Sequence, residues 1–438
     1  MSTSTKRLLR RLTAFVFGLV AVGAVPAAAQ ATYRIVSYMS ELGPPLGLVE
    51  GTPGLFHSVG GSAQQGAFTI TTEGVKTMLT TFATSTYVQG QLVSSNDQRF
   101  YSVIQKSINP PNVFSVGSAP GKQIYSPQTI VPVLTQNLPE GGLLGVGPPV
   151  TGDTWYLTGV DLHGTVRPMY TFPSGERLPN TALLGNDGNY YGISYLNDGS
   201  GYVFRVTPSG SLTKISNFPG NTFAYNPYFV PLLQATDGNL YGATPNGGTN
   251  GTGTIYKLTL GGQYTLLYTF PKGVDYNPMA LIEGSDGNLY GATLGQNGHS
   301  LLFRITESGQ YTQLYQMTIE GCTCLLTQGS DGIIYGTAQV GGPYGAGAVF
   351  ALDAGLPKPA PRVPYFSPHN GAIGTQVRFW GSNLLDASVQ FNGVAATVVS
   401  TSGPNYAFAT VPEGAASGPI TVTTPGGSVT THASFTVQ

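Results

Sequence analysis

The segment Leu232-Leu233-Gln234-Ala235-Thr236-Asp237-Gly238-Asn239-Leu240-Tyr241-Gly242 decides the fold, because close copies of it recur along the chain. Three other copies end in Asp187-Gly188-Asn189-Tyr190-Tyr191-Gly192, Asp286-Gly287-Asn288-Leu289-Tyr290-Gly291 and Asp331-Gly332-Ile333-Ile334-Tyr335-Gly336. A Gly-rich turn follows each copy, and then an alternating segment such as residues 254–258. After another turn comes a run such as residues 264–270, so each copy opens a longer repeating unit.

Three degenerate copies precede these four, at residues 50–57, 97–102 and 140–145. The positions that align with the Gly of Asp-Gly are 54, 98, 141, 188, 238, 287 and 332, so the unit repeats every 43 to 50 residues. A unit of this length, built from alternating segments and tight turns, is typical of a four-stranded propeller blade. Asp-Gly suits the hairpin between the first two strands, because Gly tolerates a positive φ.

The two ends of the repeat region predict how the ring closes. The seventh unit stops after residues 349–353 and lacks a fourth strand, whereas residues 33–39 match the fourth-strand segment 311–317. We therefore expect an all-β fold in which residues 31–356 form a seven-bladed β-propeller, closed by the N-terminal strand.

The repeat core, its following Gly-Gly step and its Leu-Tyr-Thr-Phe run resemble the GloVer tandem repeat of exported bacterial proteins. The resemblance extends over residues 31–356; it is close in units four to six, fair in the seventh and weak in the first three. It implies a secreted or surface repeat protein, usually with a variable C-terminal sorting region. The family carries no agreed catalytic residues, so none is transferred to this chain.

A second module follows a Pro-rich linker at residues 357–361. Short alternating segments bounded by Gly, Pro and Asn turns predict an antiparallel sandwich over residues 361–438. Its motifs Phe366-Ser367-Pro368, Gly381-Ser382-Asn383-Leu384 and Val389-Gln390-Phe391-Asn392-Gly393 resemble an IPT/TIG immunoglobulin-like domain. The resemblance implies an interaction or spacer module, and no recognisable enzyme module lies beside it.

The first 29 residues have the pattern of a signal peptide. Four basic residues precede an uncharged run at residues 14–25, and small residues end at Ala29, near which we expect cleavage. The run is too short to span a bilayer and no second one follows, so the mature chain is expected to be secreted or at the cell surface, with the periplasm left open. Only 9% of residues are charged, against about 25% in ordinary domains, and the net charge is −1. Nucleic acid is therefore not an expected partner.

Few side chains form a recognisable chemical motif. Asp187, Asp237, Asp286 and Asp331 supply one carboxylate per unit, which favours a turn role over calcium, the alternative cofactor left open. Cys322 and Cys324 would lie roughly 6.5–7 Å apart on a strand, which favours two thiols over a strained disulfide. His57 stands where other units have Tyr, so we expect it to pack in a strand. The sequence predicts no catalytic residue, no metal site and no cofactor.

The candidate binding surface follows from propeller topology. Segments that lead into each innermost strand meet at one channel mouth, together with the turns between strands two and three. Tyr and Asn suit sugars, since one gives an apolar platform and the other directed hydrogen bonds. The predicted ligand-binding residues are Tyr225, Asn226, Tyr228, Asp275, Tyr276 and Asn277, with Asn246–Asn250 nearby.

The favoured function is a non-catalytic binding or cell-surface interaction protein, whose partner is an extracellular polysaccharide or a cell-surface protein. Three alternatives stay open. Each Pro could merely fix a strand start and each Tyr could pack between blades. The second alternative is an enzyme that acts on a glycan or a lactone, because propeller enzymes gather catalytic groups from several blades. The third is a structural matrix protein.

Overall fold

The computed structural model describes most of the chain after the predicted signal peptide. The described residues are 31–40, 43–60, 66–82, 86–95, 99–106, 112–116, 122–125, 133–138, 142–147, 154–161, 165–178, 182–218, 222, 232–272, 277–294, 300–317, 320–321, 325–403 and 405–438. Every regular element in these ranges is a strand. A membrane-spanning helix is not found among them. The predicted signal peptide lies outside the described residues.

Up to Asp353, the described strands form four-stranded antiparallel sheets and one two-stranded ribbon. The first three sheets of four consecutive strands are β2 (Val49–Thr52), β3 (Leu55–Gly60), β4 (Gly66–Thr71), β5 (Lys76–Thr81); β6 (Thr86–Ser94), β7 (Phe100–Lys106), β8 (Asn112–Val116), β9 (Lys122–Tyr125); and β10 (Val133–Asn137), β11 (Gly142–Gly147), β12 (Tyr156–Asp161), β13 (Val166–Thr171). The next three are β14 (Ala182–Leu184), β15 (Tyr190–Tyr195), β16 (Gly201–Val206), β17 (Leu212–Phe218); β18 (Leu232–Gln234), β19 (Leu240–Thr244), β20 (Thr254–Leu258), β21 (Tyr264–Thr269); and β22 (Pro278–Glu283), β23 (Leu289–Thr293), β24 (Leu301–Ile305), β25 (Tyr311–Gln316).

The last sheet joins the two ends of the repeat region. Its strand order is β1 (Thr32–Tyr38), β30 (Ala348–Asp353), β28 (Ile334–Ala338), β27 (Leu326–Gln328). The pairing of β1 with β30 runs from Thr32 opposite Asp353 to Tyr38 opposite Ala348, with a bulge between Ile35 and Ser37. The N-terminal strand thus supplies the fourth strand of this sheet, as the sequence predicts. The ribbon pairs β26 (Glu320–Gly321) with β29 (Val340–Gly341).

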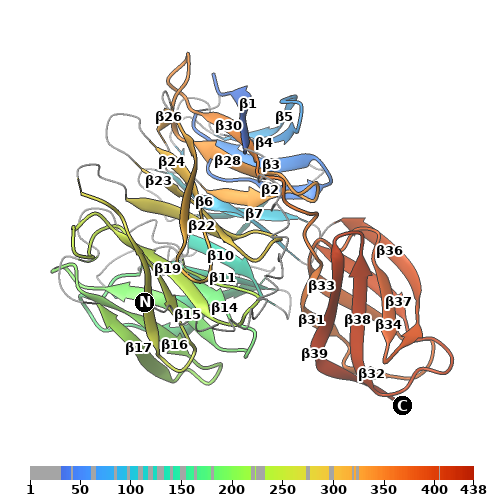
Figure 1. The fold of residues 1–438 in the computed structure, drawn as a ribbon. Helices are drawn as coiled ribbons and strands as arrows, with labels where there is room; N and C mark the ends of the chain where they lie inside the picture. The colour runs from blue at the N-terminus through green and yellow to red at the C-terminus, as the bar shows by residue number, and fades with distance from the viewer. Residues whose placement is uncertain are drawn as a thin grey trace, which may run out of the picture.

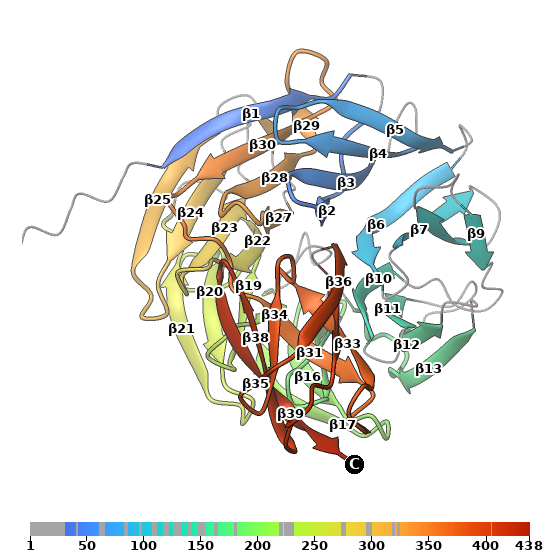
Figure 2. The same cartoon turned by 90° about the vertical axis from the view of Figure 1, so that its right-hand side faces the viewer.

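The sheets stand around a central axis as an all-β propeller (Figure 2). The first strand of each sheet, such as β2, β22 and β27, lies near the axis, and the last, such as β5, β21 and β25, lies at the perimeter. Successive strand residues point to opposite faces, so each sheet can bury side chains against both neighbours. Sheet β14–β17, for example, contributes Tyr202 to the cluster shared with β10–β13 and Val203 to the cluster shared with β18–β21.

One hydrophobic cluster fills each junction between neighbouring sheets in the described part of the chain. The final junction joins the ends: Phe56 and Phe68 of sheet β2–β5 pack with Tyr335 and Val349 of the last sheet. Because this cluster follows those at the other junctions, the packing is continuous around the ring.

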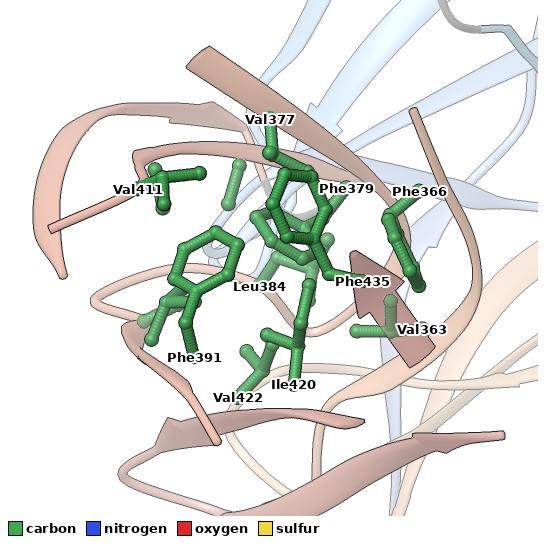
Figure 3. Close-up of a cluster of buried hydrophobic side chains, with 14 residues drawn as sticks. Val363, Phe366, Val377, Phe379, Leu384, Phe391, Val411, Ile420, Val422 and Phe435 are labelled. Atoms are coloured by element: carbon green, nitrogen blue, oxygen red, sulfur yellow. The ribbon is translucent and has the colours of Figure 1, made fainter. Parts of the chain in front are cut away.

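The C-terminal module, from β31 onward, contains two sheets packed around one core (Figure 3). One sheet has the order β31 (Arg362–Ser367), β33 (Gln376–Ser382), β37 (Tyr406–Thr410), β36 (Thr397–Gly403), and the other β32 (Asn370–Gly371), β39 (Gly427–Val437), β38 (Gly418–Thr424), β34 (Ser388–Phe391), β35 (Val394–Ala395). Phe379 of the first sheet and Phe391, Ile420 and Phe435 of the second are buried between them. The module lies beside one face of the ring (Figures 1 and 2).

The linker between the modules contacts that face of the ring. The carbonyl oxygen of Pro357 accepts hydrogen bonds from Ser285 Oγ at 2.5 Å and Gln328 Nε2 at 3.4 Å. A Cβ on Gly332 would lie 2.6 Å from the carbonyl oxygen of Leu356. These contacts place the linker against the turns between first and second strands.

Candidate functional site

The aspartate of each Asp-Gly turn accepts hydrogen bonds from the residues that follow it in the same hairpin. In the turn between β18 and β19, Asp237 Oδ1 accepts from the Asn239 backbone N–H at 2.9 Å. Its Oδ2 accepts from Asn239 Nδ2 at 2.7 Å, Tyr241 Oη at 2.8 Å and Lys257 Nζ at 2.7 Å. Burial pushes the pKa of Asp237 upward, but the hydrogen bonds from Lys257, Asn239 and Tyr241 outweigh it and lower this pKa to about 2. The turn role predicted for this aspartate is confirmed.

The other three aspartates repeat this geometry. Asp187, Asp286 and Asp331 each accept from the backbone N–H two residues later and from the Tyr hydroxyl four residues later. Within the described residues, no three His, Cys, Asp or Glu side chains are grouped so that they could hold a metal ion. These carboxylates already have protein donors, so any calcium would compete with hydrogen bonds inside the turn.

A second set of hydrogen bonds links each of these turns to the next sheet. Gln234, at the end of β18, accepts from the Asn186 backbone N–H of the preceding sheet at 2.8 Å. Glu283 in β22 accepts from the backbone N–H and the hydroxyl of Thr236. Gln328 in β27 accepts from the Ser285 backbone N–H through Oε1 at 3.0 Å and donates from Nε2 to Ser285 Oγ at 2.8 Å. We call these contacts the turn-to-strand links.

One of these links spans the ring closure. Glu50 in β2 accepts from the Ser330 backbone N–H at 2.8 Å and from Ser330 Oγ at 2.9 Å, across 280 residues of sequence. The Gly54 N–H also donates to Glu50, at 2.8 Å. Burial raises the pKa of Glu50 above its ordinary value, and these hydrogen bonds partly offset the rise. Residue 50 therefore ties the first sheet to the last.

The face of the ring that carries the Asp-Gly turns is the turn face, and the opposite face is the loop face. Antiparallel strands alternate in direction, so connections from second to third strand, and from one sheet to the next, lie on the loop face. Its described parts include residues 245–253, Asn277 and residues 339–347. The linker contacts the turn face, so the loop face points away from the linker.

The predicted ligand-binding residues fall mainly outside the described part of the chain. Those outside it are Tyr225, Asn226, Tyr228, Asp275 and Tyr276. Asn277 is described and half-buried, and its carbonyl oxygen accepts from the Leu294 backbone N–H at 2.8 Å. That hydrogen bond fixes the start of β22 on the loop face.

Two of the described connections on the loop face, residues 245–253 and 339–347, show how its side chains are used. In the first, the Asn250 side chain donates to the Phe270 carbonyl at 3.0 Å, so its amide holds the loop in place. In the second, Tyr344 is 67% exposed and Val340 is 56% exposed. Tyr344 was not singled out from the sequence, because nothing there distinguishes it from the many Tyr residues that pack between sheets.

His57 occupies the Tyr position of its unit, as expected. Its ring stacks on Phe100 of the neighbouring sheet, with centroids 4.0 Å apart. Burial lowers the pKa of its imidazole to about 4. The packing role predicted for this histidine is confirmed. Cys322 and Cys324 lie outside the described residues.

A buried carboxylate that the sequence did not reveal lies beside sheet β14–β17. Glu176 accepts hydrogen bonds from the Tyr202 hydroxyl and, at 3.3 Å, from Ser194 Oγ. Lys214 Nζ lies 3.6 Å from Glu176 Oε1 and 3.9 Å from the centre of the Tyr202 ring. Burial and the Glu176 hydrogen bond raise the pKa of Tyr202. The cluster anchors the segment before β14 to the sheet.

The fold and its repeated turns define an all-β propeller protein. The chain belongs to the Gloeobacter/Verrucomicrobia repeat family, whose model matches residues 178–407. The match begins just before the fourth unit, where the repeat becomes regular, and continues into the C-terminal module. Comparison with curated protein sequences gives no match.

Solved structures resemble the chain only distantly. A fungal alcohol oxidase of the AA5 family in complex with copper has a TM-score of 0.49 at 12% identity, covering 91% of this chain and 98% of that one. The WD40 β-propeller domain of Doa1 has a TM-score of 0.48 at 10% identity, covering 73% and 96%. Oligogalacturonate lyase from Vibrio parahaemolyticus has a TM-score of 0.43 at 12% identity, covering 74% and 97%. Similarity at this level says nothing about what this chain binds.

Proposed function

We propose that this chain is an exported seven-bladed β-propeller with an immunoglobulin-like C-terminal module, and that its loop face binds extracellular polysaccharide without catalysis. Export is supported by the basic and apolar pattern of residues 1–29. The blade number is supported by the regular repeat spacing and by the continuous packing around the ring. The order of short strands in two packed sheets supports the immunoglobulin-like module.

The observation that carries the binding proposal is the exposed Tyr344 on the loop face. Many described tyrosines of the repeat are buried between sheets, and several of their hydroxyls pair with the turn aspartates, as Tyr241 pairs with Asp237. Tyr344 instead presents a flat apolar ring and a hydroxyl to solvent, which together suit the apolar face and the hydroxyls of a sugar.

The different use of polar side chains on the two faces also supports binding at the loop face. On the turn face, the carboxylates and amides of the repeat are used in turns and turn-to-strand links, and the linker covers part of it. Tyr225 and Tyr276 lie outside the described residues, in the segments that precede β18 and β22, and propeller topology predicts that such segments reach the loop face.

The test is a polysaccharide and glycan-array screen of the mature chain, with and without a chelator. We expect saturable binding that survives chelation and is weakened about tenfold by Tyr344→Ala, Tyr225→Ala or Tyr276→Ala, the effect of losing one aromatic contact worth about 1.4 kcal/mol. Leu266→Ala is the control, because Leu266 is an exposed apolar residue on the perimeter strand β21.

The other possible results of this screen favour other functions. Binding that disappears with the chelator would favour the calcium interpretation. Shortening of the polysaccharide during incubation would favour the enzyme alternative. Binding to no polysaccharide at high protein concentration would contradict the proposal and favour a structural or protein-partner role.

A further inference from the structure

The outward face of one C-terminal sheet carries a row of aromatic side chains. Phe379 of β33 is buried in the module core, so the residues on either side of it point away from the core. These residues are Arg378 and Trp380, which pair with Phe408 of β37 and Tyr365 of β31, respectively. We call Tyr365, Arg378, Trp380 and Phe408 the outer aromatic face.

The four side chains lie close enough to form one continuous surface. The ring centroids of Tyr365 and Trp380 are 5.3 Å apart. The Arg378 guanidinium carbon lies 5.6 Å from the centre of the Trp380 ring and 4.7 Å from that of Phe408. The guanidinium therefore sits between two rings, which limits its motion and orients its N–H donors.

This surface is partly exposed to solvent in the described part of the chain. Arg378 is exposed, and Tyr365, Trp380 and Phe408 are half-buried. The rest of this face adds hydroxyls and an amide, from Ser367, Gln376 and Thr410.

Within the described module, no acidic side chain pairs with the positive charge of Arg378. The only carboxylates among residues 362–438 are Asp386 and Glu413, and both lie in turns outside the sheet. No ion pair joins either of them to Arg378 in the described part of the chain. A surface of flat rings with one unpaired guanidinium complements a flat ligand that carries anionic groups.

We propose that the outer aromatic face binds an acidic polysaccharide. Sugar rings stack on Tyr365, Trp380 and Phe408, and the anionic group of one sugar pairs with Arg378. A carboxylate or a sulfate satisfies this chemistry equally, because both accept two parallel N–H bonds from a guanidinium. This site belongs to the C-terminal module and stands whether or not the loop face of the ring binds a ligand.

The test measures binding of the full mature chain to polygalacturonate, to dextran sulfate and to neutral dextran by isothermal titration. We expect binding to at least one acidic polymer and none to neutral dextran, with weakening as salt is raised. Arg378→Gln should weaken binding about tenfold, the loss expected when a charged hydrogen bond is removed. The two acidic polymers show whether carboxylate or sulfate is preferred.

Three variants make the result specific. Lys358→Gln removes the same charge from the exposed linker and should leave binding unchanged. Trp380→Phe retains a ring and should bind more tightly than Trp380→Ala, and melting temperatures confirm that each variant is folded. Equal binding by wild type and Arg378→Gln, or no binding to either acidic polymer, would overturn this proposal. Loss of binding in Tyr225→Ala or Tyr344→Ala but not in Arg378→Gln would place the polysaccharide on the ring instead.

Discussion

The glycine that follows Tyr in each regular repeat makes room for an aromatic ring on the next strand. Gly192, Gly242, Gly291 and Gly336 lie directly opposite Phe204, Tyr256, Phe303 and Phe350. A Cβ at Gly242 would be 2.3 Å from Tyr256 Oη, and one at Gly291 would be 2.2 Å from Phe303 Cζ. The repeated Gly is therefore a packing requirement within each sheet.

Replacing Gly242 by alanine should destabilise the ring by about 1–3 kcal/mol, because the fully buried Tyr256 cannot move away from the new methyl group. Urea unfolding of Gly242→Ala measures this loss. Gly261→Ala is the matched control, since its Cβ would meet only Thr259 Oγ1, at 3.8 Å. Similar stability of the two variants would contradict this packing role.

His57 should make stability depend on pH. Its pKa is about 4 in the folded chain, against an ordinary value of 6.5. Between these values the unfolded chain binds a proton at His57 and the folded chain does not, so stability falls as the pH drops through this window. The loss is on the order of 3 kcal/mol and levels off below the lower value.

The variant His57→Phe isolates this contribution, because it keeps a ring against Phe100 and cannot be protonated. Urea unfolding from about pH 7 to about pH 4 should show a shallower fall in stability for the variant than for wild type. Parallel curves would show that His57 does not titrate differently on folding.

At the scale of elements, the turn-to-strand links tie neighbouring sheets together. Glu283→Leu should destabilise the ring by about 1 kcal/mol, because the N–H and hydroxyl of Thr236 lose their acceptor at a partly exposed site. Glu283→Gln should cost less, since Gln234 and Gln328 make the same link in neighbouring sheets. Thermal melting of the two variants checks this order, and an equal loss in both would contradict it.

Much of each element could be predicted from the sequence. The Asp-Gly turns, the alternating strands and the packing of His57 follow from local pattern and from comparison between units. The turn-to-strand links could not be predicted, because they depend on which turn lies beside the end of each inner strand. The outer aromatic face was missed because Val377, Phe379 and Trp380 are all apolar, so the pattern does not show which side of β33 faces the core.

The candidate site was less predictable than the fold. Connections on the loop face vary between units, so the repeat gives no template for their conformation. Tyr225 and Tyr276 remain predictions, and Asn277 proved to hold the start of β22 through its backbone. The exposure of Tyr344 is evident only in the structure, where other tyrosines are buried between sheets.

At the scale of the whole molecule, ring closure depends on β1. Its pairing with β30 and the stacking of Tyr33 on Tyr315, with centroids 4.0 Å apart, join it to two sheets. Deleting residues 31–40 should remove on the order of 5 kcal/mol, from several hydrogen bonds, the buried Met39 and the partly buried Tyr33, Ile35 and Val36. We expect a sharply lower melting temperature than for a chain that starts at Ala31. An unchanged melting temperature would refute closure by this strand.

The most direct test of the binding account is hydrogen–deuterium exchange of the mature chain, with and without the tightest polysaccharide found in the screen. The account predicts slower exchange in residues 245–253 and 339–347 on the loop face, and unchanged exchange in the Asp-Gly turns on the opposite face. Slower exchange in the turns alone, or no change in either loop, would contradict binding at the loop face.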